Sequence, residues 1–208
     1  MKLILSICLF GAFNMIGFSQ DSSSSIKLKR DSGYRENVIR HDDVIINIPF
    51  DWKLYSETET NILKEYLLES TGFNVPFDYY LSLSSEEDYP NINVTIRKAE
   101  EFKQLTFDQF KDYFKEIYQA TSEVIIEGTK SVMTEYKDKG FIVDRENNRF
   151  FVVHDALVVN VGPVRTIGAM ILMDEYMVNI NFNHNLDEFD RYESALRIMA
   201  NSVRRVGE

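Results

Sequence analysis

Cysteine is almost absent from this 208-residue chain, whose single copy is Cys8. Cys8 stands inside an apolar run at residues 3–18 that directly follows Lys2, which is the pattern of a signal peptide. We expect a signal peptide at residues 1–19, with cleavage one residue later as the alternative. The mature chain then holds no cysteine, which excludes disulfides, thiolate metal sites and cysteine nucleophiles.

Long hydrophobic segments are missing after the signal peptide. The run at residues 3–18 is itself shorter than the roughly twenty residues that a spanning helix needs, although an uncleaved anchor is the alternative. Cys8 lies in the middle of the run and follows Ile7, whereas a lipidated cysteine comes at the end of such a run after a small residue. We therefore expect an exported protein, periplasmic or secreted, with no transmembrane segment after signal removal and no lipid on Cys8.

Glycine is scarce, with nine copies in the whole chain. The chain contains no Gly-x-Ser-x-Gly pentapeptide, no Gly-x-x-x-x-Gly-Lys phosphate loop and no Gly-x-Gly-x-x-Gly dinucleotide fingerprint. These absences argue against the common serine hydrolases, nucleotide hydrolases and dinucleotide enzymes. We expect no enzymatic activity, no cofactor and no metal. A hydrolase of another type would need a nucleophile within hydrogen-bond reach of His154 or His184.

Basic residues are outnumbered, with 23 Lys and Arg against 33 Asp and Glu and a net charge of -10. Such a surface repels phosphate backbones, so nucleic acid is excluded as a partner. Residues 20–42 are the exception, since they combine a serine run with an excess of Lys and Arg. We interpret this segment as a flexible basic arm, either a solvated linker, which we favour, or a docking segment for an acidic partner or lipid head groups.

Residues 43–208 show the periodicities of a single α+β domain. Two capping boxes, at residues 56–59 and 106–109, predict the starts of amphipathic helices. Trp52, the only tryptophan, follows a proline-terminated strand and is typical of a core plug. The first half also contains four segments with strand patterns, at residues 44–50, 51–55, 79–83 and 92–97.

The second half is richer in strand patterns and ends in a helix. Three long strands, joined by short turns, predict an antiparallel meander. The first two are apolar on both faces, which predicts cover on both sides of the sheet. The expected elements are β segments at 123–127, 131–136 and 140–144, a turn at 146–149, long strands at 150–160, 164–173 and 176–183, and a helix at 187–204.

The order of these elements resembles the PsbP-like and DcrB-like family of exported domains. The resemblance rests on a strand ending in Ile48-Pro49-Phe50-Asp51-Trp52, on a helix introduced by Thr106-Phe107-Asp108-Gln109-Phe110, and on a meander closed by Glu188-Phe189-Asp190-Arg191-Tyr192. It covers roughly residues 43 to 205. It implies an antiparallel β-sheet sandwiched between helices, a PsbP-like α/β/α sandwich, and no catalytic residues. Proteins of this family serve as accessory or assembly factors.

The candidate ligand-binding residues lie on two of the long strands: His154, Asp155, Asn179, Asn181 and Asn183. The asparagines alternate, so they share one face of their strand. We expect this face to meet water where helices leave the sheet uncovered, with ligand binding as the alternative. His154 and Asp155 are adjacent and point to opposite faces of a regular strand, although a β-bulge would bring them together.

These observations predict a non-enzymatic accessory or binding module of the bacterial cell envelope that acts through contact with an envelope protein partner. The alternative is a periplasmic small-ligand or metal-ion binding protein that uses His154 and the asparagine face. Convergence of those side chains in a concave pocket would favour the alternative. The identity of the partner or ligand and the oligomeric state do not follow from the sequence.

Overall fold

The computed structural model describes residues 38–71, 77–83, 90–128, 133–159 and 161–207. The predicted signal peptide and the larger part of the predicted arm lie outside the described residues. Within the described residues, no helix is long and apolar enough to cross a membrane.

Seven antiparallel strands form the main sheet, in the order β3-β4-β5-β9-β8-β7-β6. The hairpins β6-β7, β7-β8 and β8-β9 are the meander that the sequence predicts, and β5 joins it from the first half of the chain by pairing with β9. The strands are β3 (Lys53–Leu54), β4 (Tyr79–Ser82), β5 (Asn91–Lys98), β6 (Met133–Asp144), β7 (Arg149–Val158), β8 (Gly162–Met173) and β9 (Tyr176–Asn185).

A second, three-stranded sheet has the order β1-β2-β10. Its strands are β1 (Val38–His41), β2 (Val44–Asn47) and β10 (Arg204–Arg205). β1 pairs with β2 along its whole length, and its Ile39 is buried in the core. The prediction of a flexible arm to residue 42 is therefore wrong for Val38–His41, because an apolar side chain and a full set of strand partners order this segment.

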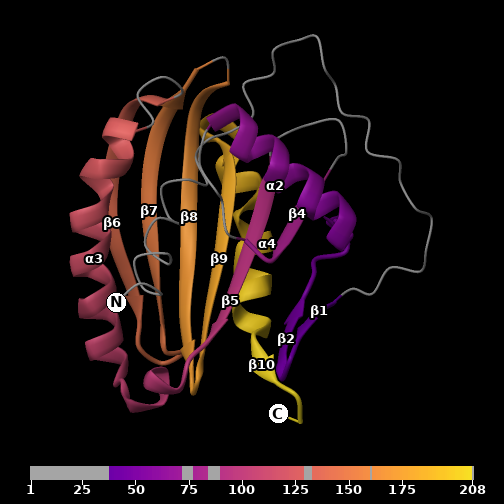
Figure 1. Cartoon of the computed structure of the whole chain (residues 1–208), viewed down its shortest axis with the longest axis vertical. Coiled ribbons are helices and arrows are strands. Elements are labelled where there is room, and N and C mark those ends of the chain that lie inside the picture. The colour runs from indigo at the N-terminus through magenta and orange to yellow at the C-terminus, as the bar shows by residue number, and fades with distance from the viewer. Residues whose placement is uncertain (1–37, 72–76, 84–89, 129–132, 160, 208) are drawn as a thin grey trace.

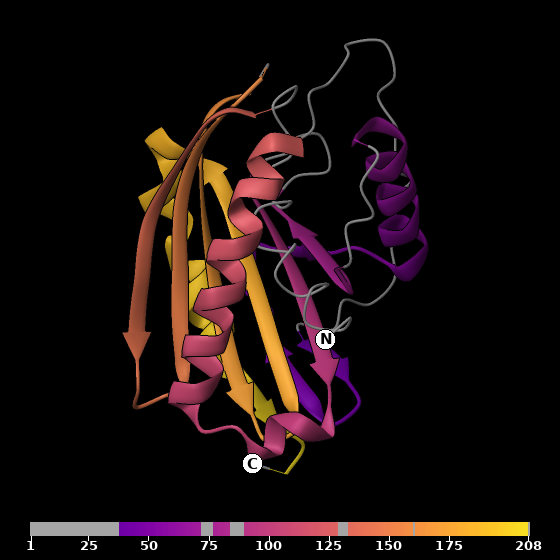
Figure 2. The same ribbon diagram turned by 60° about the vertical axis from the view of Figure 1, so that its left-hand side comes forward.

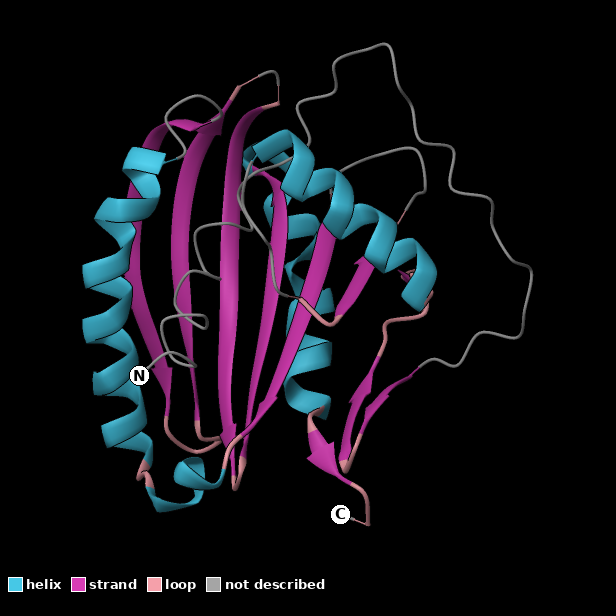
Figure 3. Ribbon diagram, viewed as in Figure 1, coloured by secondary structure: helices cyan, strands magenta, loops and turns pink. Residues whose placement is uncertain are grey.

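The helices cover the main sheet on both faces (Figures 1 and 3). α2 and α3 lie on one face, while α4 and the small sheet lie on the other, as the view turned by 60° also shows (Figure 2). This is the predicted α+β fold, an antiparallel β-sheet sandwiched between helices. The helices are α2 (Glu57–Thr71), α3 (Phe107–Gly128) and α4 (Phe189–Ser202), with 3₁₀ turns η1 (Glu100–Gln104) and η2 (Leu186–Glu188).

The larger apolar core lies between the main sheet, α4 and the small sheet. Leu196 and Met199 of α4 pack in it with Ile180 of β9. Trp52 is 5% exposed, and its ring meets Phe182 edge-on at 6.0 Å. The prediction that Trp52 plugs the core is confirmed.

The second core lies under α3. Phe110, Phe114 and Tyr118 are buried at helical spacing and belong to the same apolar cluster as Phe150 of β7. The helix begins with the predicted capping box, because the Gln109 amide donates to Thr106 Oγ1 at 3.3 Å and the Thr106 amide donates to Gln109 Oε1 at 2.9 Å. These bonds occupy donors that a helix start otherwise leaves unpaired.

Four predicted elements differ from the structure. Residues 123–127 continue α3 to Gly128 instead of forming a strand, because the helix propensity of Val and Ile is only slightly lower than that of good helix formers. The described part of the segment at 131–136 and the segment at 140–144 belong to one strand, β6 (Met133–Asp144), with register shifts that include one between Asp138 and Gly140. The last helix ends at Ser202, after which the chain enters the small sheet.

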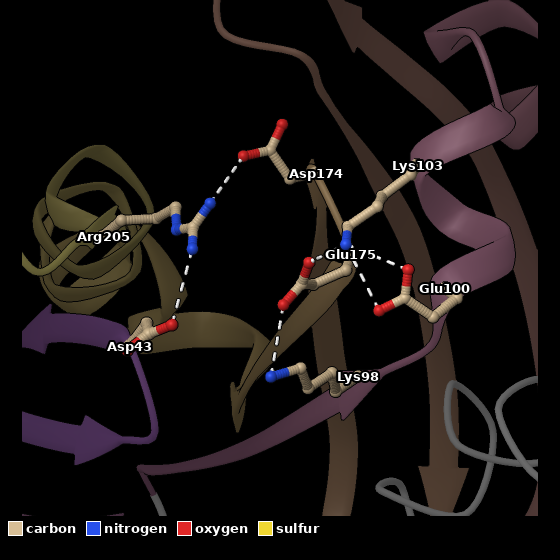
Figure 4. Close-up of polar contacts among 7 residues, drawn as sticks. All are labelled: Asp43, Lys98, Glu100, Lys103, Asp174, Glu175 and Arg205. Carbon is tan, nitrogen blue, oxygen red and sulfur yellow. Dashed lines mark hydrogen bonds and ion pairs between the residues drawn. The ribbon is translucent and has the colours of Figure 1, made fainter.

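An ionic cluster joins both sheets at the β8-β9 hairpin (Figure 4). Glu175 pairs with Lys98 of β5, with an oxygen–nitrogen distance of 3.2 Å, and with Lys103 of η1. Arg205 of β10 bonds Asp174 at 2.9 Å and Asp43, next to β2, at 3.4 Å. The cluster therefore ties the end of the chain to the β8-β9 turn and to the β1-β2 turn.

Candidate functional site

The asparagines of β9 face the α3 side of the sheet and are paired with polar residues of the neighbouring strands. Asn183 lies opposite Thr166 of β8 and Asn91 of β5. Thr166 Oγ1 donates to Asn183 Oδ1 at 2.6 Å, and Asn183 Nδ2 donates to Asn91 Oδ1 at 2.8 Å. A hydrogen-bonded row of side chains therefore crosses three strands.

A second row runs parallel to the first. Asn181 Nδ2 donates to Asn93 Oδ1 at 3.2 Å, and Gly168 of β8 lies opposite Asn181 on its other side. A Cβ atom at position 168 would stand 2.6 Å from Asn181 Oδ1. The Asn181 amide thus occupies the space that any other residue at position 168 would fill.

The third asparagine, Asn179, lies opposite Thr95 of β5 and Met170 of β8. Its Oδ1 atom is buried and has no hydrogen-bond partner among the described residues. Together the three asparagines and their partners form the asparagine rows. Asn179, Asn181 and Asn183 are each no more than 2% exposed, so the expectation that this face meets water is wrong: polar side chains of adjacent strands bond one another instead.

His154 of β7 extends the first row, because it lies opposite Thr166. The ring is buried, and its Nδ1 atom is 3.3 Å from the hydroxyl of Tyr118, which is hydrogen-bonded to the hydroxyl of Tyr136. Burial, together with the neighbouring Tyr136, raises the pKa of Tyr118 far above its ordinary value. Burial also raises the pKa of Tyr136 to about 12. Both phenols stay protonated at neutral pH and act as hydrogen-bonding groups, so neither serves as a base.

Asp155 faces the opposite side of the sheet from His154. Burial alone would raise the pKa of Asp155, but hydrogen bonds from Arg165 at 2.7 and 3.1 Å, with Lys139 nearby at 3.4 Å, hold it below its ordinary value. The register between β7 and β8 is regular through both residues, and the nearby bulge is in β6. Of the predicted residues, the structure places His154 and the three asparagines on one face of the sheet, with His154 in the row of Asn183, and it places Asp155 on the opposite face.

No group of three or more His, Cys, Asp or Glu side chains in the described part of the chain is placed to hold a metal ion. Side chains of a strand alternate between the two faces of the sheet, so the two histidines of the sheet are kept apart. His184 lies opposite Arg165 on the α4 side, while His154 lies on the α3 side. The asparagine rows supply neutral donors and acceptors, most of which bond one another.

A different surface is open on the α4 side of the sheet. α4 packs against β9, β8 and β2, and in Figure 1 it lies behind β9 and β5, away from β6. Ile142 of β6 is 60% exposed and Leu157 of β7 is 37% exposed, with the partly buried Phe151 and Val153 between them. We call these four side chains the β6-β7 face. We expected both faces of the sheet to be covered at β7. Within the described residues, only its face on the α3 side is fully covered.

A groove lies where α2 meets β4 and the end of β1. It encloses about 490 Å³ and brings together residues from three distant segments, including His41, Tyr79 and one face of α2. The tyrosine hydroxyl donates to Arg40 O at 3.2 Å and is 3.1 Å from His41 Nδ1. Sequence reasoning missed this α2 groove, because no local pattern links β1, α2 and β4.

The sequence matches no known protein family and no curated protein. The structure is similar to that of cyanobacterial PsbP (CyanoP) from Synechocystis sp. PCC 6803, with a TM-score of 0.55 and 10% identity over 87% of this chain and 99% of that chain. Weaker similarities are to the Ran-binding protein Mog1p of Saccharomyces cerevisiae (TM-score 0.42, 16% identity, 79% of this chain and 90% of that chain). LpqN, involved in cell envelope biogenesis of Mycobacterium tuberculosis, has a TM-score of 0.41 and 9% identity over 80% of this chain and 87% of that chain. The chain has a PsbP-like fold, as its element order predicted.

Proposed function

We propose that the protein is a non-enzymatic accessory module of the cell envelope that acts by binding a protein partner. The observation that carries this proposal is the β6-β7 face, where, among the described residues, α4 does not cover the apolar side chains as it covers β8 and β9. Exposed apolar patches bordered by polar residues mark protein contact sites. The envelope location rests on the predicted signal peptide.

Charged residues interrupt and border the β6-β7 face, because Asp155 lies between Val153 and Leu157 on β7, and these charges specify the partner further. Asp155 and Arg165 are paired with each other beside Leu157. Lys137 of β6, opposite Asp155, is exposed and has no acidic partner among the described residues. The partner surface that fits is therefore an apolar segment that carries a carboxylate opposite Lys137.

Packing against the face suits β6 better than the addition of a strand along its edge. Edge strands avoid pairing through bulges and lysines, and β6 has both, with a register shift between Asp138 and Gly140 and with Lys137 and Lys139 beside it. The apolar contact is thus made by side chains of the β6-β7 face rather than by the free backbone edge.

The test is photo-crosslinking in the native host with a photoreactive residue in place of Ile142 or, separately, Leu157. Both positions should give the same crosslinked product, which contains one envelope protein. When that envelope protein is tagged instead, it should also capture this chain. A photoreactive residue at Ile62 of α2, which is 38% exposed, is the matched control and should not give that product. The proposal is wrong if Ile62 captures the same protein as efficiently, or if neither face position gives a product.

Charge substitutions provide a second readout. Ile142→Asp and Lys137→Glu should each reduce the crosslinked product formed from Leu157, by loss of apolar contact and by charge repulsion respectively. Ile198→Asp on α4, at a side chain that is 49% exposed, should leave the product unchanged. Because all three positions are solvent-exposed, the folded protein should accumulate normally in each variant. Unchanged capture by Ile142→Asp would contradict the proposed surface.

A further inference from the structure

The α2 groove has the size and the lining of a small-ligand site. Its volume of about 490 Å³ falls in the range of small-molecule pockets. Leu54, Tyr55 and Tyr79 give it apolar surface, and polar groups of α2 form the facing wall. Small-ligand binding is thereby favoured at a place that is separate from the asparagine rows and from the β6-β7 face.

The α2 wall carries one charge of each sign. Glu57 and Lys64 are seven positions apart, with Thr60 and Asn61 between them, so all four lie on one face of the helix. At 1.5 Å per residue the two charged positions stand about 10 Å apart along the axis. Neither Glu57 nor Lys64 has an ion-pair partner among the described residues, although the Lys64 ammonium lies 5.4 Å from the centre of the Phe77 ring.

The remaining polar groups near the groove are already engaged. Asp78 is hydrogen-bonded to Arg97 at 2.9 Å and to the Ile96 amide at 2.7 Å. The capping box of α2 occupies two backbone donors at the start of the helix, because the Ser56 amide donates to Glu59 Oε2 at 2.7 Å and the Glu59 amide donates to Ser56 Oγ at 3.2 Å. The uncommitted charges of the groove are the carboxylate of Glu57 and the ammonium of Lys64.

We propose that the α2 groove binds a short linear peptide with free ends. The ammonium of the peptide pairs with Glu57 and its carboxylate pairs with Lys64, while Thr60 and Asn61 hydrogen-bond the peptide groups between them. An extended chain spans about 3.3 to 3.6 Å per residue, so about three residues fit the distance between the two charges. Side chains of the peptide lie against the rings of Tyr55 and Tyr79.

The experiment is isothermal titration calorimetry on protein purified after expression of the full chain. The probes are trialanine with free ends, trialanine with an acetylated amino end and an amidated carboxyl end, and free alanine. Trialanine should bind, whereas the blocked peptide and alanine should bind at least about tenfold more weakly, since each charge-assisted hydrogen bond is worth about tenfold or more. The proposal is overturned if trialanine does not bind at millimolar concentration, or if blocking both ends leaves its affinity unchanged.

Variants with matched controls locate the site. Glu57→Gln and Lys64→Met should each lower the affinity for trialanine about tenfold. Glu65→Gln, on the exposed side of α2, and Lys115→Met, exposed on α3, make the same charge changes outside the groove and should leave the affinity unchanged. Binding that survives both groove variants would overturn the assignment. The capture of a protein through Ile142 is expected to be the same in all four variants, so the two proposals fail separately.

Discussion

The replacement of Gly168 by alanine tests the close packing of the asparagine rows. The new Cβ would stand 2.6 Å from Asn181 Oδ1, which is well inside ordinary contact distance. Asn181 would have to move, and its movement weakens the 3.2 Å hydrogen bond to Asn93. The side chain has little room to yield, because it is 1% exposed.

The expected loss follows from two opposing effects. The insertion of a methyl group into a packed interior costs about 1 to 3 kcal/mol. The loss of glycine from the unfolded chain returns about 0.4 to 1 kcal/mol, because alanine has fewer unfolded conformations. We therefore expect Gly168→Ala to lower the free energy of unfolding by about 1 to 2 kcal/mol.

A double-mutant cycle separates this clash from a general effect of alanine in β8. Asn181→Ala alone leaves the Asn93 amide oxygen without its donor and should cost about 1 to 3 kcal/mol. In the double variant the clash is gone, so Gly168→Ala should then be close to neutral. The two losses should fail to add by about 1 kcal/mol or more.

The assay is urea unfolding followed by the fluorescence of Trp52, a buried and single reporter in contact with Phe182. Linear extrapolation gives the free energy of unfolding of all four proteins of the cycle. Losses from Gly168→Ala and Asn181→Ala that add to within about 0.5 kcal/mol would refute the reasoning. A Gly168→Ala protein as stable as the parent would refute it as well.

Three further outcomes are expected in the same assay. Ser56→Ala should lower the free energy of unfolding by about 1 kcal/mol, because it removes the cap of α2; an unchanged midpoint would contradict this. The lowered pKa of Asp155 means that its pairing with Arg165 stabilises the fold above about pH 4 and loses this effect as the pH falls through the folded-state pKa. On acidification, the free energy of unfolding of Asp155→Asn should therefore fall less than that of the parent, by up to about 1 kcal/mol. Equal falls in the two proteins would refute the assignment. Because the pKa of Tyr136 is raised to about 12, stability should fall as the pH rises above about 10, where the unfolded tyrosine ionises first, and Tyr136→Phe should reduce this fall; a fall of the same size in Tyr136→Phe would count against it.

Elements with strong local signals could be predicted from the sequence. Both capping boxes form as expected, because their bonds connect residues only three positions apart. The hairpin turns were predictable for a similar reason: Asn148 and Asp174 adopt positive φ angles of 47° and 48°, which asparagine and aspartate tolerate better than most residues. Where the local signal was ambiguous, as at residues 123–127, the strand prediction was wrong, because Val and Ile are also accepted in helices and these residues continue α3.

The burial of the asparagines was missed because one strand was interpreted alone. The alternation of Asn179, Asn181 and Asn183 predicts a water-facing strand only if the neighbouring strand has no hydrogen-bond partners for their side chains. The sequence did contain the missing signal, since Asn91 and Asn93 alternate in the same way on β5. The α2 groove had no such signal, because its residues come together only when two sheets and a helix are packed.

The asparagine rows explain how the sheet keeps its register between segments that are far apart in the chain. β5 and β9 pair through residues such as Asn91 and Asn183, which are 92 positions apart. A slip of β9 by one residue would turn every side chain of that strand to the other face, which would place its asparagines in the apolar core beside Leu196 and Met199 of α4 and leave their amides without partners. Buried amides without hydrogen bonds cost about 1 to 3 kcal/mol each, so the polar rows on one face and the apolar core on the other select the same register.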